Sequence, residues 1–164
     1  MAHDVKAAGN APPVLDGSDL RVGIAASRFN DVITLRLLEG VHRGLRSAAV
    51  PADGITETWV PGAFELPIAA QALIASGRVD AVVCIGCVIR GDTAHFEHVA
   101  TQCASGIQRV ALDTGVPVLF GVLTTENLDQ ALARSEPEGG HNTGEDAAHA
   151  AVEMAALMTR LAAG

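Results

Sequence analysis

Aromatic residues are scarce in this chain of 164 residues, which has one tryptophan, four phenylalanines and no tyrosine. A chain of this length can bury a substantial core as a single domain. Because rings are so few, that core has to consist of Ala, Val, Leu and Ile. Apolar residues make up 49% of the sequence, which is typical of a globular protein and sufficient for such a core.

Basic residues are also few. Lys and Arg number 11 against 19 Asp and Glu, so the formal net charge is −8. A partner with a phosphate backbone requires a basic surface, and we therefore expect no nucleic-acid partner. A local cationic pocket for a small anion is compatible with this charge balance.

Long apolar runs are missing as well. No stretch reaches the roughly 20 residues that span a bilayer, and the start MAHDVKAAGNAPP has no apolar centre of a signal peptide. We therefore expect a cytoplasmic protein without membrane contact. The segment 1–18 is rich in Ala, Gly and Pro, which predicts an N-terminal arm with little regular structure before a single domain over residues 19–164.

Cysteine is limited to Cys84, Cys87 and Cys103, which cannot all pair within one chain. Cys84 and Cys87 have the CxxC spacing found at redox and zinc sites. Here they lie in a β-branched run, where a spacing of three directs the side chains to opposite faces of a strand. No second CxxC completes a metal site, so we expect buried thiols that behave as small apolar groups.

Short apolar runs alternate with segments of helical periodicity along the chain. Strands are predicted at 20–27, 55–60, 80–89 and 117–123, and helices at about 33–46, 65–76, 93–112, 127–134 and 145–162. Strands that are apolar throughout, joined by helices, indicate a parallel sheet covered on both faces. The sequence therefore predicts a three-layer α/β/α domain with four parallel strands in the flavodoxin-like order 2-1-3-4.

Polar and aromatic residues collect where these strands end, in ASRFN (26–30), WVPGAFE (59–65), VIRGDTAHFE (88–97) and FGVLTTEN (120–127). Ligands bind at this edge of such sheets, near the switch in strand order. The aromatic residues at or just beyond the strand ends are Phe29, Trp59, Phe64, Phe96 and Phe120. They predict stacking against a flat ring; the alternative, that some of them cap the sheet, stays open.

The turn Gly91-Asp92-Thr93 is expected to begin a helix, where free N–H groups favour an anion. Alternatively, Asp92 or Thr93 is an ordinary N-cap. His95 lies in the first helical turn and suits proton transfer near neutral pH. We expect His98 to be a packed or surface histidine, since a metal pair with His95 lacks a recognisable third ligand.

Taken in order, the strand-end motifs resemble those of the 6,7-dimethyl-8-ribityllumazine synthase family. The matching stretches are SRFN (27–30), VPGAFELP (60–67), GCVIRGDTAHFEHV (86–99) and GVLTTENLDQAL (121–132). The resemblance runs from about Leu20 to the C-terminus. It implies an enzyme that condenses 5-amino-6-ribitylamino-uracil with 3,4-dihydroxy-2-butanone 4-phosphate in the penultimate step of riboflavin synthesis. Phosphate leaves, and no metal or other cofactor is needed.

The resemblance also implies roles for individual residues. Phe29 would stack on the pyrimidine, with Asn30 beside it, and the ribityl chain would bind at Ala63, Phe64 and Glu65. The pyrimidine edge would be lined by Cys87, Val88 and Ile89, and Phe120 would cover the ring from a neighbouring subunit. Phosphate would be bound by Gly91, Asp92, Thr93 and Arg134. The catalytic groups would be His95, as general acid–base, and Arg134.

Members of this family form pentamers with active sites between subunits, and some pack pentamers into capsids. Pro12-Pro13 disfavours an arm strand, and His141–Asp146 resembles the segment of pentameric fungal members, so we expect a free homo-pentamer; a capsid is the alternative. Two departures are Thr143, where many relatives have Lys, and Cys87, where many have Thr. We expect activity to survive, with weaker phosphate binding.

Three other functions compete with this interpretation. A non-catalytic relative that binds flavin or lumazine would use the same stacking site, and Thr143 keeps that alternative open. A flavodoxin-like FMN carrier requires a phosphate loop after the first strand, but SRFND offers no Gly or Ser/Thr cluster there. A structural shell protein would need neither His95 nor Arg134.

Overall fold

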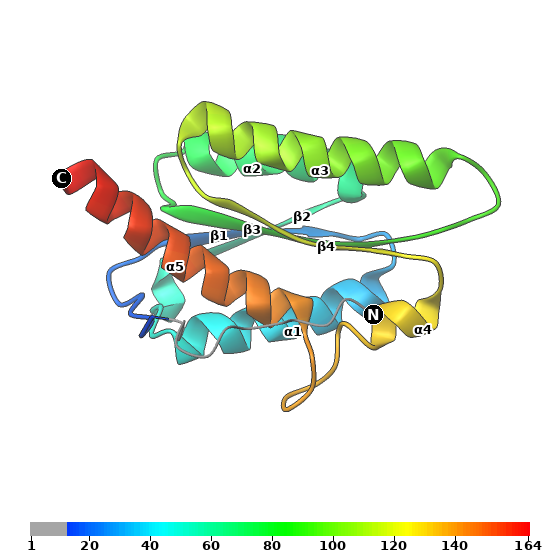
Figure 1. Cartoon of the computed structure of the whole chain (residues 1–164), viewed down its shortest axis with the longest axis horizontal. Helices are drawn as coiled ribbons and strands as arrows, with labels where there is room; N and C mark the ends of the chain where they lie inside the picture. The colour runs from blue at the N-terminus through cyan, green and yellow to red at the C-terminus, as the bar shows by residue number, and fades with distance from the viewer. Residues whose placement is uncertain (1–12) are drawn as a thin grey trace.

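A computed structural model describes residues 13–164 of the protein. The strands are β1 (Val22–Ser27), β2 (Ile55–Val60), β3 (Ala81–Ile89) and β4 (Val118–Thr125). The helices are α1 (Asp31–Ser47), α2 (Leu66–Ala75), α3 (His95–Thr114), α4 (Leu128–Leu132) and α5 (Thr143–Ala163), with short 3-10 turns η1 (Ala52–Gly54) and η2 (Ala63–Glu65). The strands form one parallel sheet in the order β2-β1-β3-β4 (Figure 1), which confirms the predicted fold.

Helices cover both faces of the sheet. In Figure 1, α2 and α3 lie on one face, whereas α1, α4 and α5 lie on the other. The central strand β1 is buried along its whole length. Each face of the sheet contributes to a separate apolar cluster, so the core has two halves divided by the strands.

Small side chains form the contact between α1 and α5, as expected for a chain with few aromatic residues. The buried face of α5 consists largely of alanines, among them Ala147, Ala148 and Ala151. A Cβ added to Gly44 of α1 would lie 2.7 Å from the Cβ of Ala148, so the two helices approach too closely for a larger residue. The two helices therefore pack through small residues on both sides.

The cysteines lie as their spacing predicts. Cys84 belongs to the cluster on the α2/α3 face, whereas Cys87 belongs to the cluster on the α1/α5 face. All three thiols are free and buried. The CxxC spacing therefore holds two thiols apart on opposite sides of β3.

Two boundaries differ from the prediction. The helix after β3 begins at His95, so Asp92 and Thr93 form bends before it, and neither of them is its N-cap. The N-cap is Ala94, which has no side-chain oxygen, and the His95 N–H donates to Thr93 Oγ1 at 3.4 Å. In addition, β4 continues to Thr125, which places Phe120 inside the strand opposite Cys84 and not at its end.

The described part of the expected N-terminal arm, residues 13–18, contains no helix or strand. It nevertheless contacts the domain, because Leu15 packs against the core and the Gly17 N–H donates to the Ala48 carbonyl at 2.6 Å. Pro12 and the residues before it, where the rest of the arm is expected, lie outside the described residues. Within residues 13–164, no helix is long and apolar enough to cross a membrane.

Candidate functional site

A cavity of about 700 Å³ opens at the carboxyl ends of β1, β2 and β3, where the strand order predicts a ligand site. This volume is in the range that holds a small organic ligand. Its lining residues come from four segments: Phe29 and Asn30; Pro61, Gly62, Ala63, Phe64 and Glu65; Cys87, Val88, Ile89, Gly91 and Thr93; and His95, Phe96, His98 and Val99.

The segment after β1 presents an aromatic ring to this cavity. Asn30 has a left-handed backbone conformation, with φ 61° and ψ 41°, which asparagine tolerates better than most residues. Its Nδ2 donates to the Cys87 carbonyl at 2.8 Å and thereby links the carboxyl ends of β1 and β3. The Phe29 N–H donates to the Pro61 carbonyl at 3.1 Å, while the side chain of Phe29 is 73% exposed. The backbone is therefore fixed and the ring is free to contact a ligand.

The segment after β2 holds a carboxylate at the same cavity. Glu65 Oε2 accepts a hydrogen bond from the Gly62 N–H at 3.0 Å, and the Glu65 N–H donates to the Gly62 carbonyl at 3.2 Å. This reciprocal pair closes the short turn η2 and orients the side chain. Within this turn Ala63 is buried, whereas Phe64 remains exposed. One oxygen of Glu65 is thus used internally, and its carboxylate is held at the cavity wall.

The end of β3 supplies an apolar wall. Cys87 is 2% exposed, and this burial raises the pKa of its thiol to about 11, although a hydrogen bond with Thr125 partly offsets the effect. The thiol is therefore neutral near pH 7. Val88 and Ile89 are half-buried and continue this wall to the mouth of the cavity.

The turn that follows β3 offers backbone donors. The amides of Gly91, Asp92 and Thr93 donate to no other residue of the described chain. Successive free N–H groups in a turn can bind an anion. His95 begins α3 immediately afterwards and is exposed at the same cavity. A donor-rich turn and an imidazole therefore share one wall.

The side chain of Arg90 holds this turn in place. Nothing in the sequence around Arg90 predicts this role. Its Nε donates to Glu126 Oε2 at 2.7 Å, its Nη1 donates to Glu97, and its guanidinium lies 4.4 Å from the ring centre of Phe96. The hydrogen bond from Arg90 lowers the pKa of the Glu97 carboxyl. These contacts tie the end of β3 to both the end of β4 and the start of α3.

Residues 19–159 match the family model described as 6,7-dimethyl-8-ribityllumazine synthase. The chain belongs to this family. A GDP-L-fucose synthetase from Naegleria fowleri is similar to 93% of this chain with 11% identity and a TM-score of 0.39, and the match covers 47% of that protein.

Most residues that the lumazine synthase resemblance singles out meet at the cavity. Three of them do not line it: Asp92, Phe120 and Arg134. Asp92 is exposed within the turn beside it. Phe120 lies within β4, and Arg134 follows α4, where its Nη1 donates to the Gln130 carbonyl at 3.0 Å. Helix α4 packs on the face of the sheet opposite α3 (Figure 1), so Arg134 follows a helix on one face whereas His95 begins a helix on the other.

Two further residues of the strand-end segments, His98 and Trp59, take different places. His98 also lines the cavity, and its spacing of three from His95 on α3 could have predicted this. Trp59 lies within β2, packs against the core and donates its indole N–H to Glu57 Oε1 at 3.0 Å, and it does not line the cavity. Within residues 13–164, no group of three or more His, Cys, Asp or Glu side chains could hold a metal ion, so the His95–His98 pair finds no third ligand there.

Proposed function

We propose that this protein is a transferase that condenses 5-amino-6-ribitylamino-uracil with 3,4-dihydroxy-2-butanone 4-phosphate to 6,7-dimethyl-8-ribityllumazine, in the penultimate step of riboflavin biosynthesis. The observation that carries this proposal is the cavity that joins Phe29, Glu65 and His95 at one edge of the sheet. Family membership supports the same reaction class. The three free thiols support a reducing compartment, and we propose the cytoplasm.

The pyrimidine substrate would occupy the inner part of the cavity. The exposed ring of Phe29 offers a stacking surface for a flat heterocycle. The polar edge of that heterocycle would meet the backbone of Cys87, Val88 and Ile89. Glu65, oriented by its bond with Gly62, would accept hydrogen bonds from the ribityl hydroxyls.

The phosphate would lie at the turn Gly91-Asp92-Thr93, whose free amides suit an anion. The 5-amino group of the pyrimidine would add to the butanone carbonyl and lose water to form an imine. Elimination of phosphate would convert the hydroxyl-bearing carbon into an enol and then a carbonyl, and the ribitylamino nitrogen would close the ring on that carbonyl with loss of a second water. His95 would move protons during imine formation and ring closure. Positioning both reactants together would supply much of the rate enhancement, and the anion site would stabilise the departing phosphate.

We further propose that a second copy of the chain completes the site. Phe120 and Arg134 do not line the cavity of their own chain, yet the family resemblance assigns both to the substrate. In a homo-pentamer, one copy would supply the cavity, and its neighbour would supply Phe120 over the ring and Arg134 at the phosphate. A capsid built of such pentamers is the alternative assembly.

Formation of lumazine, followed by absorbance with both substrates, tests the proposed reaction. We expect Arg134→Ala to lower the rate roughly 100- to 1000-fold, because it removes a charged partner of the phosphate. His95→Ala should cost about 10- to 100-fold, at the low end for general acid–base catalysis, because amine and carbonyl condense slowly unaided. The exposed Arg46 of α1 provides the control Arg46→Ala, which should retain the wild-type rate. Wild-type turnover no faster than buffer would refute the proposal.

Mixed oligomers test the shared site. Phe29→Ala removes the stacking ring from the cavity side, and Arg134→Ala removes the guanidinium from the other side. If the two sides belong to different copies, random mixing of the inactive variants restores about a quarter of the sites. Recovery of activity after refolding the two variants together would support the shared site. Activity that stays at the level of either variant alone would contradict it.

A non-catalytic relative that binds a lumazine or flavin is the second candidate. The observation that favours it is Thr143, which stands near Arg134 where many relatives carry lysine. The Thr143 N–H donates to the Arg134 carbonyl at 2.9 Å, so this position contributes backbone contact and no charge. Tight binding of the pyrimidine without turnover would support this candidate.

A further inference from the structure

The loop that carries Arg134 is held in a closed form by its own backbone. It connects α4 to α5 and spans residues 133–142. Ser135 and Asn142 form an antiparallel bridge, and the Thr143 N–H donates to the Arg134 carbonyl at 2.9 Å. The Glu136 N–H donates to the His141 carbonyl at 2.9 Å. The position of Arg134 therefore depends on how this loop is fixed to the domain.

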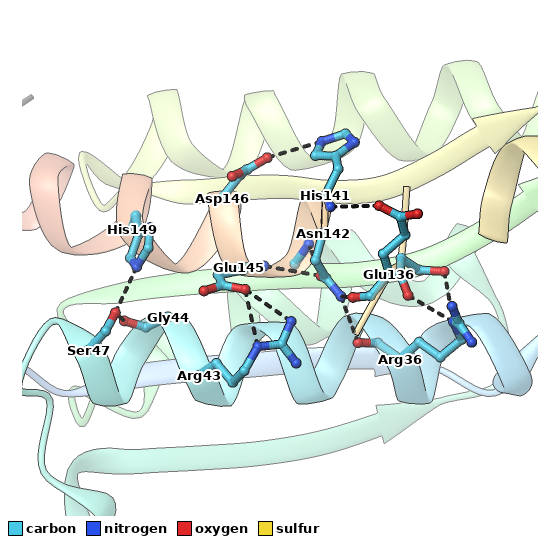
Figure 2. Close-up of polar contacts among 12 residues, drawn as sticks. Arg36, Arg43, Gly44, Ser47, Glu136, His141, Asn142, Glu145, Asp146 and His149 are labelled. Carbon is cyan, nitrogen blue, oxygen red and sulfur yellow. Dashed lines mark hydrogen bonds and ion pairs between the residues drawn. The ribbon is translucent and has the colours of Figure 1, made fainter. Parts of the chain in front are cut away.

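Asn142 fixes the loop to α1. Its side chain is 2% exposed, and its Nδ2 donates to the Arg36 carbonyl at 3.0 Å and to the Glu136 carbonyl at 2.9 Å (Figure 2). Its Oδ1 accepts from the N–H groups of Gly144 and Glu145 at 2.9 and 3.3 Å. Both N–H groups and both lone pairs of the amide are thus used. An N-cap role explains only the two bonds to Oδ1.

Helix α1 is shaped to receive this amide. A Cβ added to Gly40 would lie 2.1 Å from Asn142 Oδ1, so any larger residue at this position would collide with the amide. A Cβ added to Gly144 would lie 2.1 Å from the Leu37 carbonyl oxygen. The contact between α1 and the end of the loop is therefore specific in shape as well as in hydrogen bonding.

Arg36 fixes the residue next to Arg134. Its Nε donates to the Ser135 carbonyl at 2.8 Å and lies 3.3 Å from Ser135 Oγ. Ser135 is fully buried, and its hydroxyl donates to the Ala131 carbonyl at 2.9 Å. The loop is therefore tied at Ser135 by the Arg36 side chain and at Asn142 by the Arg36 backbone.

We infer that Arg36 and Asn142 are positioning residues that set the affinity for the phosphate substrate by fixing the backbone of Arg134. This inference rests on the proposed phosphate role of Arg134. Neither residue would touch substrate. If the two residues served stability alone, their loss would weaken the fold without discriminating between the two substrates.

Arg43 provides a matched control on the same helix. Its Nε and Nη2 donate to Glu145 Oε2 at 3.2 and 3.0 Å, so it also ties α1 to α5 (Figure 2). It makes no contact with the loop 133–142 among the described hydrogen bonds and ion pairs. Arg36→Ala and Arg43→Ala thus remove the same side chain from the same helix, but only the first releases the loop.

The experiment measures KM for each substrate in wild type, Arg36→Ala, Arg43→Ala and Asn142→Asp, which retains the cap acceptor and loses both donors. We expect Arg36→Ala and Asn142→Asp to raise KM for the butanone phosphate on the order of 10-fold. KM for the pyrimidine should stay within about twofold of the wild-type value in every variant. In Arg43→Ala, KM for the butanone phosphate should also stay within about twofold of the wild-type value. Equal changes in Arg36→Ala and Arg43→Ala, or equal changes in both KM values, would overturn the inference.

Hydrogen exchange of the Thr143 amide separates this inference from the proposed function. Loss of the Thr143–Arg134 bond should speed that exchange in Arg36→Ala and not in Arg43→Ala. If wild type forms no lumazine, the proposed function fails, and the positioning of Arg134 is judged on this exchange alone. Unchanged protection of Thr143 in Arg36→Ala would overturn the positioning whether or not the enzyme is active.

Discussion

Cys87 lies in the wall of the cavity, yet its environment makes it a poor nucleophile. Burial raises the pKa of Cys87 to about 11 and that of Cys103 to about 12, from an ordinary value of 9.0. At pH 8 both thiols are therefore protonated in the folded protein. We expect a disulfide reagent at pH 8 to label no cysteine of the native protein and all three after unfolding in guanidinium. Rapid labelling of native Cys87 would contradict this account.

The same shifts predict how stability depends on pH. Because folding raises the pKa of these thiols, the folded state binds their protons more tightly than the unfolded state. The contribution of Cys87 is complete below pH 9.0, the ordinary thiol value, and is lost as the pH rises through about 11. The free energy of unfolding, measured in urea, should therefore fall over this interval. Replacing Cys87 with Ala should reduce that fall, and an unchanged pH profile would contradict the assignment.

At the residue scale, the strand-end rule locates most of the cavity from the sequence alone. Phe29, Glu65 and His95 lie on three different segments, and each follows a strand whose carboxyl end must reach the same edge. The role of Arg90 cannot be predicted in this way, because it depends on Glu97 and Glu126, which approach it only after folding. The hydrogen bonds of the Asn142 side chain cannot be predicted for the same reason, because one of its acceptors, the Arg36 carbonyl, is far away in the sequence.

At the element scale, Gly44 sets the distance between α1 and α5. Alanine at a helix interior normally stabilises by up to about 1 kcal/mol over glycine. Here the new Cβ would lie 2.7 Å from the Ala148 Cβ and 2.9 Å from the Glu145 carbonyl oxygen. Pushing the helices apart costs typically about 1–3 kcal/mol, so overpacking outweighs propensity. We expect Gly44→Ala to lower the free energy of unfolding by about 1–2 kcal/mol in urea titrations.

The exposed Glu39 on the same helix gives the control for this prediction. Glu39→Ala should change the free energy of unfolding by less than about 0.5 kcal/mol. A Gly44→Ala variant as stable as wild type, or more stable, would show that α1 and α5 are not in contact as described.

The spacing of apolar residues in the sequence predicts the helices and strands, but it does not predict the residues at which they begin and end. Three apolar runs and the segment ITETWV predict the four strands, and the order 2-1-3-4 is the one common to flavodoxin-like folds. The helix after β3 starts two residues late, because the backbone of Asp92 and Thr93 bends away before α3 begins. Likewise β4 extends to Thr125 because it pairs with β3 as far as Ile89, and a pairing partner is not visible in the strand's own sequence.

At the scale of the whole molecule, large apolar side chains remain exposed on the single chain. Leu112 is 76% exposed and Phe120 is 42% exposed, a pattern typical of surfaces that contact another chain. We expect sedimentation to give one species of five times the chain mass, unchanged over a range of protein concentrations. A monomer would contradict the shared site, and a species many times heavier than a pentamer would favour the capsid.

The arrangement of the copies in the oligomer cannot be predicted from the sequence. The sequence places Phe120 and Arg134 near the substrate only through resemblance, and nothing in their spacing tells which copy they serve. The fold leaves both outside the cavity of their own chain. A site divided between copies requires the arrangement of two chains, which one chain's periodicity does not encode.

We propose that this cavity binds two substrates, condenses them and releases phosphate. The most direct measurement follows lumazine by absorbance and inorganic phosphate in the same reaction, with wild-type protein and both substrates. We expect both products to form well above the buffer rate and in equal amounts, and neither to form above that rate when the pyrimidine is omitted. Saturable binding of the pyrimidine with no lumazine or phosphate above buffer would contradict it and identify a binding protein.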